Sequence, residues 1–599
     1  MRFTLSMSEV GTWLLMVLVA SASIEPHMRM TLEATGEQTL PTSEDIARQQ
    51  HAMADHPFVS MDEAKSMFGP SEGPGANISN WGQNYCGNNI HVHHPKTYQE
   101  VAGLVKALKA QGAKVRVLGV MHSWSNVFAD DGTHVIFLDS FKSITQDPND
   151  YTRVTLQAGV TNAELADFAD SPNRGYGRFS YLKMNTLVQA VTFIGAAQTA
   201  SHGSGDGGTC GDFIESLTMI DSWGSISIFD RSHPDFLVYT ACLGMCGIIL
   251  DVTLRFSPET TGVTVTQIKA PLKDFFPRAC ETNSSFNPLK DWINSHVGGA
   301  MNYATYNSAI LSGPLDPKKA EIYTANDYCW AQGVTETPGL QVKPDRKGLP
   351  IWGTQHEPYY DKDLFIPADY QNAEGTKLHR VALGDWRLNQ NSNYMPFFGG
   401  LVQNSVLVMQ PPSFQLKAEY NTSRASSQHF VRYIEHITHA NDYSFALKVD
   451  DDYTNIYDAW WALIDINNEM FRDTGSYPMN LYAAIRWLGH SDCPLSGAYG
   501  QEGDRFVLIE ASSAHGTPGW EEFCRRVLAK FATIKTKKDG SLPKPHWGKV
   551  NKDWTPNIAA YTRQAMGPQL ERVKEAVFKT DPTGMFRNQH LSEVFELPY

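Results

Sequence analysis

The fold of this chain is indicated most clearly by the stretch Lys114-Val-Arg-Val-Leu-Gly-Val-Met-His-Ser-Trp-Ser-Asn126. It reads as a β-branched strand that ends at Gly119, followed by a turn that carries His122, Ser123 and Ser125. A turn of glycine and small hydroxyl residues exposes backbone N–H groups, which form a concavity suited to a phosphate. The histidine would lie beside the molecule to which that phosphate belongs. An ordinary strand-to-turn connection with a surface histidine is the alternative, and this stretch alone does not exclude it.

A second segment of small residues is Ile194-Gly-Ala-Ala-Gln-Thr-Ala-Ser-His-Gly-Ser-Gly205. Small side chains let the backbone approach a flat, extended ligand closely. Its glycines continue into Gly203-x-Gly-x-x-Gly208, which matches the dinucleotide-binding pattern. The following Thr209-Cys-Gly-Asp212 does not begin an apolar-periodic helix, so the strand–turn–helix context of a nicotinamide-binding Rossmann unit is missing. A Gly-rich surface loop remains the other interpretation.

Two further segments are short and uninformative alone. The first is Leu243-Gly-Met-Cys-Gly-Ile-Ile-Leu, in which two glycines reduce the side-chain bulk of a turn. An alternating strand that ends at Phe256 follows this turn. Near the far end, Pro545-His-Trp-Gly-Lys549 places a lysine three residues after a histidine, so that both could face one ligand. The alternative for the Leu243 segment is core packing, and the alternative for the segment that ends at Lys549 is a surface loop.

Together these four segments resemble one family, the flavin-dependent sugar-lactone and alditol oxidases of the vanillyl-alcohol-oxidase type. The family motifs R-V-x-G-x-x-H-S, G-x-x-x-T-x-x-H-G-x-G, L-G-x-x-G-I and H-W-x-K occur in order as residues 116–123, 195–205, 243–248 and 546–549. The closing Asp581-Pro-Thr-Gly-Met-Phe-Arg-Asn588 matches the family's D-P-x-G-x-F-x-N end. The resemblance covers residues 80–260 and 480–595 and is weak in between.

The resemblance implies an α+β fold: a two-subdomain, PCMH-type FAD-binding domain and an α+β cap domain with an antiparallel sheet. FAD is the expected cofactor, with His122 as its covalent attachment point. Covalent attachment retains the flavin and tends to raise its potential. The residues that the resemblance places against FAD are Gly119, His122, Ser123, Ser125, Ser201, His202, Gly203, Ser204, Ile248 and His546.

The resemblance also assigns the chemistry. Lys549 would stand at the reacting face, either as a base or as a cation that stabilises developing charge. Arg486, in Ala483-Ala-Ile-Arg-Trp487, would orient the substrate or stabilise reduced flavin. A hydride would pass from a carbinol carbon to flavin N5, and O₂ would reoxidise the flavin to give H₂O₂. No metal site is expected.

One position departs from the family. Relatives carry a glutamate two residues before the arginine, where it binds substrate hydroxyls, and here that position is Ala484. Losing the acceptor costs about 1–3 kcal/mol if nothing replaces it. This departure therefore leaves open a substrate that is neither a sugar lactone nor an alditol. A sugar lactone remains the first expected substrate, and a polyol or a secondary metabolite the second. Glu419 lies in another stretch similar to the family but is equally typical of a surface strand.

Three alternatives follow from the same residues. A dehydrogenase of this fold would pass electrons to an acceptor other than O₂. A non-catalytic flavin-binding protein is favoured slightly by Ala484 and disfavoured by the presence of both His122 and Lys549. A bicovalent, berberine-bridge-type oxidase would need a cysteine before the second Gly-rich segment, and residues 87–209 contain none.

Composition limits the location and the partners. A net charge of −14 argues against nucleic acid as a partner and fits a small, neutral or polar substrate better; the resemblance implies that this substrate is a hydroxylated small molecule. An apolar run over residues 11–22 ends in Ala20-Ser-Ala22, which predicts a cleaved secretory signal over residues 1–22; an uncleaved membrane anchor is the alternative. The sequons at Asn77, Asn283 and Asn421 fit a secreted glycoprotein. The eight cysteines are dispersed, so disulfides are permitted but do not form the framework, and Cys242 and Cys246 are expected to be buried.

The predicted organisation has an irregular extension over 23–79, the FAD-binding domain over 80–262, and a cap domain over 263–599 whose segment 546–599 returns to the flavin. In the first domain, a capping box at Thr97-Tyr-Gln-Glu100 predicts a helix over 101–111. Strands are predicted at 91–94, 135–138, 153–157 and 217–220, and a helix at 162–169. In the second, one clear helix is predicted over 520–530, and the tail 557–578 is predicted to be helical.

Overall fold

The computed structural model describes residues 75–82, 84–170, 181–188, 191–257, 262–309, 315–337, 340, 417–428, 440–514 and 516–599. The predicted signal and nearly all of the predicted N-terminal extension lie outside these residues. No described helix is both long enough and apolar enough to cross a bilayer. None of the eight cysteines, all of them described, forms a disulfide, and Cys242 and Cys246 are buried as predicted.

The first of three sheets has four strands in the order β1-β2-β4-β3, and its last three strands run parallel. The strands are β1 (Ala76–Ser79), β2 (Cys86–His93), β3 (Val115–Leu118) and β4 (His134–Phe137). Helix α4 (Tyr98–Ala110) connects β2 to β3, and the Thr97 side chain caps it by accepting a hydrogen bond from the backbone N–H of Glu100. The predicted helix and its Thr97 cap are therefore confirmed, but the capping box is not complete, because the Glu100 carboxylate accepts from the N–H of Lys96 over 2.7 Å. The predicted strand at 91–94 begins earlier, at Cys86.

The second sheet is antiparallel, with five strands in the order β5-β6-β9-β7-β8. They are β5 (Ile144–Gln146), β6 (Arg153–Gln157), β7 (Ile214–Ile220), β8 (Ile226–Asp230) and β9 (Ile248–Arg255). The helices of this region are α5 (Asn162–Asp170), α6 (Phe193–Gln198), the 3₁₀ turn η2 (Cys210–Phe213) and α7 (Phe236–Tyr239). Since only a single 3₁₀ turn follows Gly208, the rejection of a Rossmann unit is confirmed.

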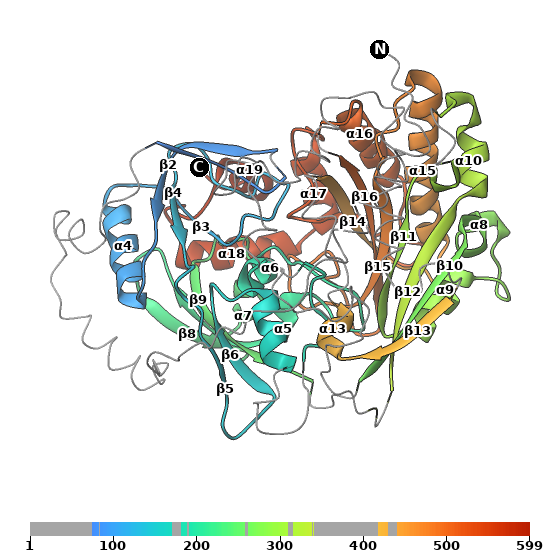
Figure 1. Cartoon of the computed structure of the whole chain (residues 1–599). Helices are drawn as coiled ribbons and strands as arrows, with labels where there is room; N and C mark the ends of the chain where they lie inside the picture. The colour runs from blue at the N-terminus through green and yellow to red at the C-terminus, as the bar shows by residue number, and fades with distance from the viewer. Residues whose placement is uncertain are drawn as a thin grey trace, which may run out of the picture. The chain divides into compact units, whose positions relative to one another are not determined.

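The third sheet is antiparallel and has eight strands, in the order β13-β10-β12-β11-β15-β16-β14-β17 (Figure 1). The strands are β10 (Val263–Pro271), β11 (Gly298–Tyr303), β12 (Tyr328–Glu336), β13 (Lys417–Thr422), β14 (Ala440–Lys448), β15 (Tyr482–Gly489), β16 (Arg505–Ala514) and β17 (Lys544–Pro545). Together with the two smaller sheets and the helices, it confirms the predicted α+β class.

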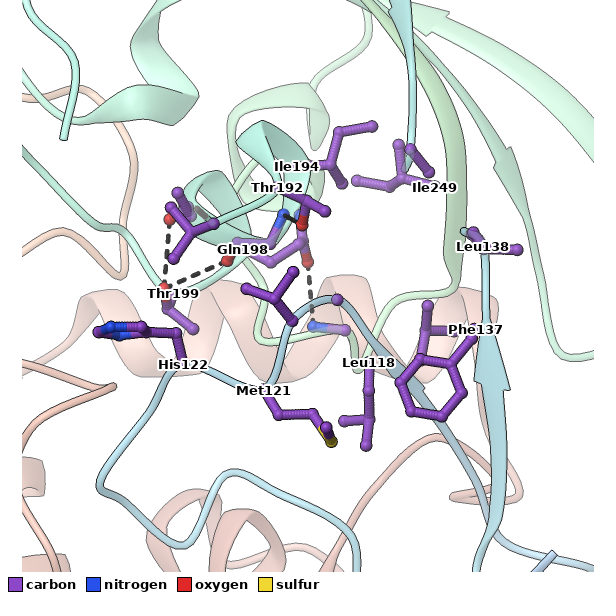
Figure 2. Close-up of a pocket in the computed structure, with 18 of the residues that line it drawn as sticks. Leu118, Met121, His122, Phe137, Leu138, Thr192, Ile194, Gln198, Thr199 and Ile249 are labelled. Atoms are coloured by element: carbon purple, nitrogen blue, oxygen red, sulfur yellow. Dashed lines mark hydrogen bonds between the residues drawn. The ribbon is translucent and has the colours of Figure 1, made fainter. Parts of the chain in front are cut away.

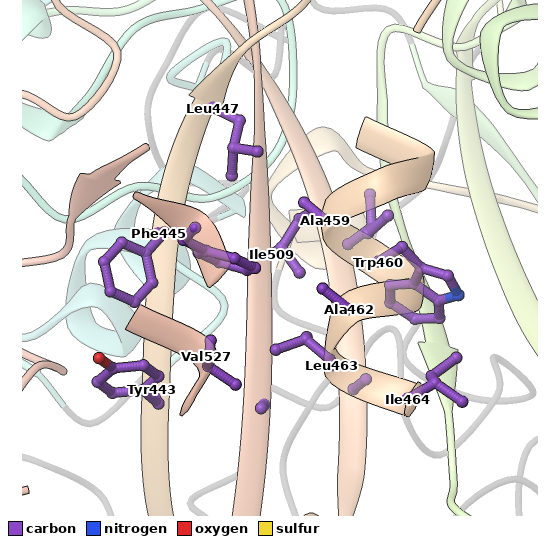
Figure 3. Packing of buried hydrophobic residues seen from close by; sticks show 14 of the residues in the cluster. Tyr443, Phe445, Leu447, Ala459, Trp460, Ala462, Leu463, Ile464, Ile509 and Val527 are labelled. Atoms are coloured by element: carbon purple, nitrogen blue, oxygen red, sulfur yellow. The ribbon is translucent and has the colours of Figure 1, made fainter. Parts of the chain in front are cut away.

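One face of the large sheet carries the core of this half of the molecule. Helices α15 (Thr454–Thr474) and α16 (Trp520–Phe531) pack on it. Figure 3 shows Phe445 and Ile509 of the sheet packed near Leu463 of α15 and Val527 of α16. Because successive side chains of a strand alternate between faces, the residues between these apolar positions point to the other, inner face.

The prediction of one clear helix in residues 263–545 is wrong. Helix α15 is 21 residues long, and α8 (Leu272–Phe275), α9 (Pro288–Ser295), α10 (Ala320–Asn326) and α13 (Arg424–Gln428) also lie there. Buried residues surround much of α15, among them Trp460, Asn467 and Asn468, so its sequence lacks a clean polar face. Helix α16 matches its prediction to within one residue.

The C-terminal tail is helical but is not one helix. It forms α17 (Ile558–Met566), α18 (Gln569–Thr580) and α19 (Gln589–Phe595). The break follows from Gly567, which has a φ of 68°, and from Pro568, which begins the next helix with its φ already helical. Helix α18 contacts α7, so the tail packs on the region of the second sheet.

His590 in α19 should make the folded chain sensitive to acid. Burial, with the nearby Lys552 charge, lowers the pKa of its imidazole from 6.5 to about 4. Below pH 6.5 the unfolded chain takes up this proton before the folded chain does, so the contribution is full above pH 6.5 and is lost towards pH 4. At pH 5 the loss is about 2 kcal/mol. Denaturant titrations at pH 7.5 and pH 5 should show His590→Gln losing that much less stability on acidification than wild type; equal losses would refute the assignment.

Candidate active site

The loop after β3 forms the first wall of the site. An added Cβ on Gly119 would lie 2.5 Å from Oγ1 of Thr192, so only glycine permits this approach. Met121 has a φ of 59°, in the left-handed region, which turns the chain before His122. The His122 ring stacks on Trp81, with centroids 4.6 Å apart, and meets Trp124 edge-on at 5.2 Å. Backbone geometry and two aromatic neighbours thus fix the histidine in place.

Residues from the far end of the chain hold this loop. The N–H of Trp124 donates to the carbonyl of Gly548 over 2.8 Å, and the Asn551 amide donates to the carbonyl of Trp124 over 2.8 Å. The Asn588 amide donates to the carbonyl of Asn126 over 2.6 Å. The backbone of the loop is therefore paired with the two C-terminal motifs.

Arg116 joins three of the sequence motifs. Its buried guanidinium donates to the carbonyls of Phe586, Val127 and Leu243, over 2.7 to 2.8 Å. Burial lowers its pKa from 12.5 to about 10, so the side chain keeps its charge at neutral pH. The arginine of the R-V-x-G motif therefore has a structural role: it connects the opening loop, the Leu243 turn and the D-P-x-G segment by hydrogen bonds.

A cavity of about 260 Å³ lies between the opening loop, the second Gly-rich segment and the Leu243 turn. Figure 2 shows His122 and Met121 on one side of it and Gln198 and Thr199 on another. Gln198 accepts a hydrogen bond of 3.0 Å from the N–H of Gly244, which ties two walls together. Apolar side chains such as Leu118, Phe137 and Ile249 form much of the lining, and glycines and small polar residues complete it. This combination suits a large, flat cofactor.

Lys549 lies at the centre of a buried ionic cluster on the inner face of the large sheet. Its Nζ is 2.7 Å from Oδ2 of Asp442 and 3.0 Å from Oε2 of Glu510. Glu510 also forms an ion pair with Arg486. The exposed fraction of these side chains is 4% to 14%, so water screens the charges little. Two carboxylates at these distances favour the charged ammonium, which speaks for Lys549 as a cation rather than a base.

Two histidines lie beside this cluster. The rings of His202 and His546 meet edge to face with centroids 5.3 Å apart. Burial, together with the nearby Arg486 and Lys549 charges, lowers both pKa values well below 6.5, so both rings are neutral at physiological pH. The buried Nε2 of His202 has no hydrogen-bond partner among the described residues, and neither does Oγ of Ser125. Such atoms are normally paired, so Nε2 of His202, beside the ionic cluster, fits a site that receives a polar ligand.

Trp124 connects the two halves of the site. Its ring contacts His122 on the cavity side, and Nζ of Lys549 lies 5.6 Å from its ring centroid. The cavity that ends at His122 and the ionic cluster around Lys549 are thus neighbours. If a cofactor lies along the cavity, the end nearest His122 lies next to the ionic cluster.

Only some of the predicted cofactor residues line the cavity. Those that line the cavity are Gly119, His122, Ser123, Ser201 and Ile248. Ser125 is buried and does not line it. His202 and His546 adjoin the ionic cluster, and Ser204 hydrogen-bonds Trp487 of β15. Gly203 is held against the carbonyl of Asn185, 1.7 Å from where its Cβ would be, so it allows two backbone segments to meet.

Asp442 and Glu510 were not predicted from the sequence. Each is the only acid in its strand, and the available signal was a charged residue at an inward position of a strand that is apolar on its other face. Glu419, by contrast, is exposed on the edge strand β13, away from the cluster.

Comparison with known proteins confirms the FAD-binding region. Residues 90–229 match the family model described as an FAD binding domain. Among curated proteins, D-arabinono-1,4-lactone oxidase of Eremothecium gossypii is 27% identical over 188 residues, and L-gulonolactone oxidase of Mus musculus 25% over 188. L-gulono-1,4-lactone dehydrogenase of Mycobacterium tuberculosis is 26% identical over 185 residues. The matched stretch spans 30–31% of this chain and 34–41% of these relatives.

Solved structures share the fold over most of the chain. A cholesterol oxidase from B. sterolicum has a TM-score of 0.66 at 14% identity and covers 88% of this chain and all of its own. A solvent-stable cholesterol oxidase has a TM-score of 0.65 at 16% identity, covering 87% of this chain and 98% of its own. The predicted α+β, PCMH-type FAD-binding fold, the resemblance to the sugar-lactone oxidases and FAD as cofactor are confirmed, whereas the domain boundaries and the covalent attachment stay predictions.

Proposed function

We propose that this chain, whose residues 90–229 belong to the FAD-binding domain family, is an FAD-dependent oxidase that oxidises a carbinol carbon of a hydroxylated small molecule. The alcohol becomes a carbonyl by losing a hydride and a proton, and O₂ takes the two electrons to give H₂O₂. The relatives named lactone oxidases support this reaction class. FAD, when bound, supplies the hydride acceptor.

The observation that carries the proposal is the ionic cluster beside the cavity. The Lys549 ammonium stabilises negative charge that develops on the substrate oxygen as the hydroxyl proton leaves. Asp442 and Glu510 hold the ammonium in position. Arg486, which forms an ion pair with Glu510, adds a second positive charge to the cluster. Because burial removes competing water, these charges act more strongly on the reacting atoms than they would in solution.

The second candidate is a dehydrogenase with an acceptor other than O₂. The relative from Mycobacterium tuberculosis, matched over 185 residues, is named a dehydrogenase. The decisive experiment supplies L-gulono-1,4-lactone, D-arabinono-1,4-lactone and xylitol to the purified holoprotein, with O₂ or with a dye as acceptor. Peroxide formed in step with O₂ uptake supports the oxidase; dye reduction without O₂ uptake supports the dehydrogenase. Bound FAD that no alcohol or lactone reduces would support a non-catalytic flavoprotein.

Export remains part of the proposal. The sequon residues Asn77, Asn283 and Asn421 are all exposed, so glycosylation would meet no steric obstacle. N-terminal sequencing of the protein from its native host would test cleavage after residue 22, and an intact N-terminus on membranes would support the anchored alternative.

Gly119→Ala should reduce flavin content. The added methyl would displace Thr192, whose hydroxyl caps α6 by accepting from the N–H of Gly195 over 3.3 Å. Two walls of the cavity would move, at a cost of about 1–3 kcal/mol. The ratio of flavin absorbance to protein absorbance measures the result. Gly119→Ala/Thr192→Ala lacks the colliding hydroxyl and should bind more FAD than Gly119→Ala alone; equal loss in both would refute the steric explanation.

A further inference from the structure

A row of side chains crosses the inner face of the large sheet at Ala484. Ser444 pairs with Glu510, Glu510 with Ala484, and Ala484 with Asn302. Residues directly opposite each other on neighbouring strands project from the same face, with Cβ atoms about 4.5–5.5 Å apart. The row therefore presents a hydroxyl, a carboxylate, a methyl and an amide. Because residue 484 is alanine, β15 places no long side chain between Glu510 and Asn302.

Glu510 has the position and the capacity to bind a hydroxyl here. It is 3% exposed and is held by Lys549 and Arg486. An ionised carboxylate offers about four lone-pair positions on its two oxygens, so two cations leave it able to accept a further hydrogen bond. Its Cα lies opposite Ala484, two residues from Arg486 on the same face.

Two further buried acceptors lie beside Glu510 on the same face. Oδ1 of Asp442 and Oγ of Ser444 have no hydrogen-bond partner among the described residues, and both side chains are at least 97% buried. Buried polar atoms are normally paired, so this face suits a ligand that brings several donors. A molecule with hydroxyls on neighbouring carbons brings them; a largely apolar alcohol with one hydroxyl does not.

We propose that Glu510 is the substrate-binding carboxylate of this site, supplied by β16 in place of a side chain at Ala484. Together with Asn302 and Asp442 it selects a compound that carries hydroxyl groups on the carbons next to the one oxidised. This inference rests on the proposed function and names its substrate class as vicinal polyols and hydroxylated lactones.

Binding to the oxidised holoprotein tests the role of Glu510 without turnover. The probes are L-gulono-1,4-lactone, D-arabinono-1,4-lactone and xylitol, followed anaerobically through the change each causes in flavin absorbance. Glu510→Gln keeps the shape but loses the charge, so the dissociation constant should rise roughly 10- to 100-fold. Glu419→Gln, the same change at an exposed edge position of the same sheet, should leave it unaltered. An unaltered constant in Glu510→Gln would overturn the assignment.

The second test moves the carboxylate from position 510 of β16 to the paired position 484 of β15. Glu510→Ala removes the charge that balances Arg486 and Lys549, and it should abolish probe binding. Ala484→Glu/Glu510→Ala restores a carboxylate in the same row and should recover binding to within about tenfold of wild type. Thermal melting of each holoprotein identifies variants that fail to fold. A folded double variant that binds no better than Glu510→Ala would contradict the proposal.

The outcomes separate this inference from the proposed function. A holoprotein that binds none of the polyhydroxylated probes but is reduced by solubilised cholesterol would overturn the substrate class and leave the oxidoreductase intact. A purified chain without bound FAD would overturn the proposed function itself.

Discussion

Lys549→Met should slow the reduction of bound flavin by substrate about 10²–10³-fold while the protein remains yellow. The substitution keeps the length of the side chain but removes the ammonium that lies between Asp442 and Glu510. Without it, negative charge that develops on the substrate oxygen loses the cation that we propose stabilises it. Anaerobic stopped-flow measurement of flavin bleaching isolates this step from reoxidation.

The same substitution has a structural consequence that must be separated from the catalytic one. Removing the ammonium from this buried ionic cluster takes away the cation paired with Asp442 and leaves Glu510 paired with Arg486, which costs about 3 kcal/mol of stability. Lys549→Met/Glu510→Gln removes one charge of each sign and should recover much of that stability. A melting temperature regained in the double variant assigns the stability lost in Lys549→Met to the unbalanced charge; the rate is compared only between wild type and Lys549→Met, because Glu510→Gln also weakens substrate binding.

A matched control is available on the surface. Lys535 is an exposed lysine, so Lys535→Met makes the same chemical change away from the cluster and should leave the rate of flavin reduction unchanged. Wild-type rates in folded Lys549→Met would contradict the role of the ammonium. A loss of flavin from Lys549→Met would instead place Lys549 among the residues that retain the cofactor.

The local elements of the FAD-binding region could be predicted because their signals are local. Thr97 and Glu100 mark the start of α4, and the strand at 153–157 alternates between faces. Helix α15 could not be predicted in the same way, because it is buried on several sides. Trp460 packs in the core while Asn467 accepts from the N–H of Met479, so neither a polar face nor a regular apolar stripe appears in the sequence.

The site shows the same limit more sharply. His122 and Lys549 lie in short motifs that are recognisable along the chain. Glu510 gains its meaning only from strand register, because pairing places it opposite Ala484, 26 positions earlier in sequence, and beside Arg486. No spacing rule connects residues on paired strands separated by a long loop. The sequence alone showed that position 484 lacks a carboxylate, but it did not show that the Glu510 carboxylate lies opposite this position.

His122→Ala should convert the bound flavin from acid-stable to acid-extractable. In wild type, precipitation with acid should leave the yellow colour in the pellet; in the variant, the FAD should appear in the supernatant. The physical reason is the placement of the imidazole, which lines the cavity and is fixed between Trp81 and Trp124. An imidazole whose orientation is fixed in the wall of the cavity is well placed to bond a cofactor that binds there.

The stack on Trp81 also decides which control is informative. His122→Ala removes an aromatic contact as well as a nucleophilic nitrogen, so loss of colour could reflect a loosened cavity. Trp81→Leu loosens the same stack but keeps the imidazole, and its pellet should stay yellow, as should that of His94→Ala, an exposed histidine paired with Asp139. A yellow pellet from His122→Ala would refute the attachment site. A colourless pellet from Trp81→Leu would show that the stack is required for the bond to form, because the nitrogen is still present but no longer held in place.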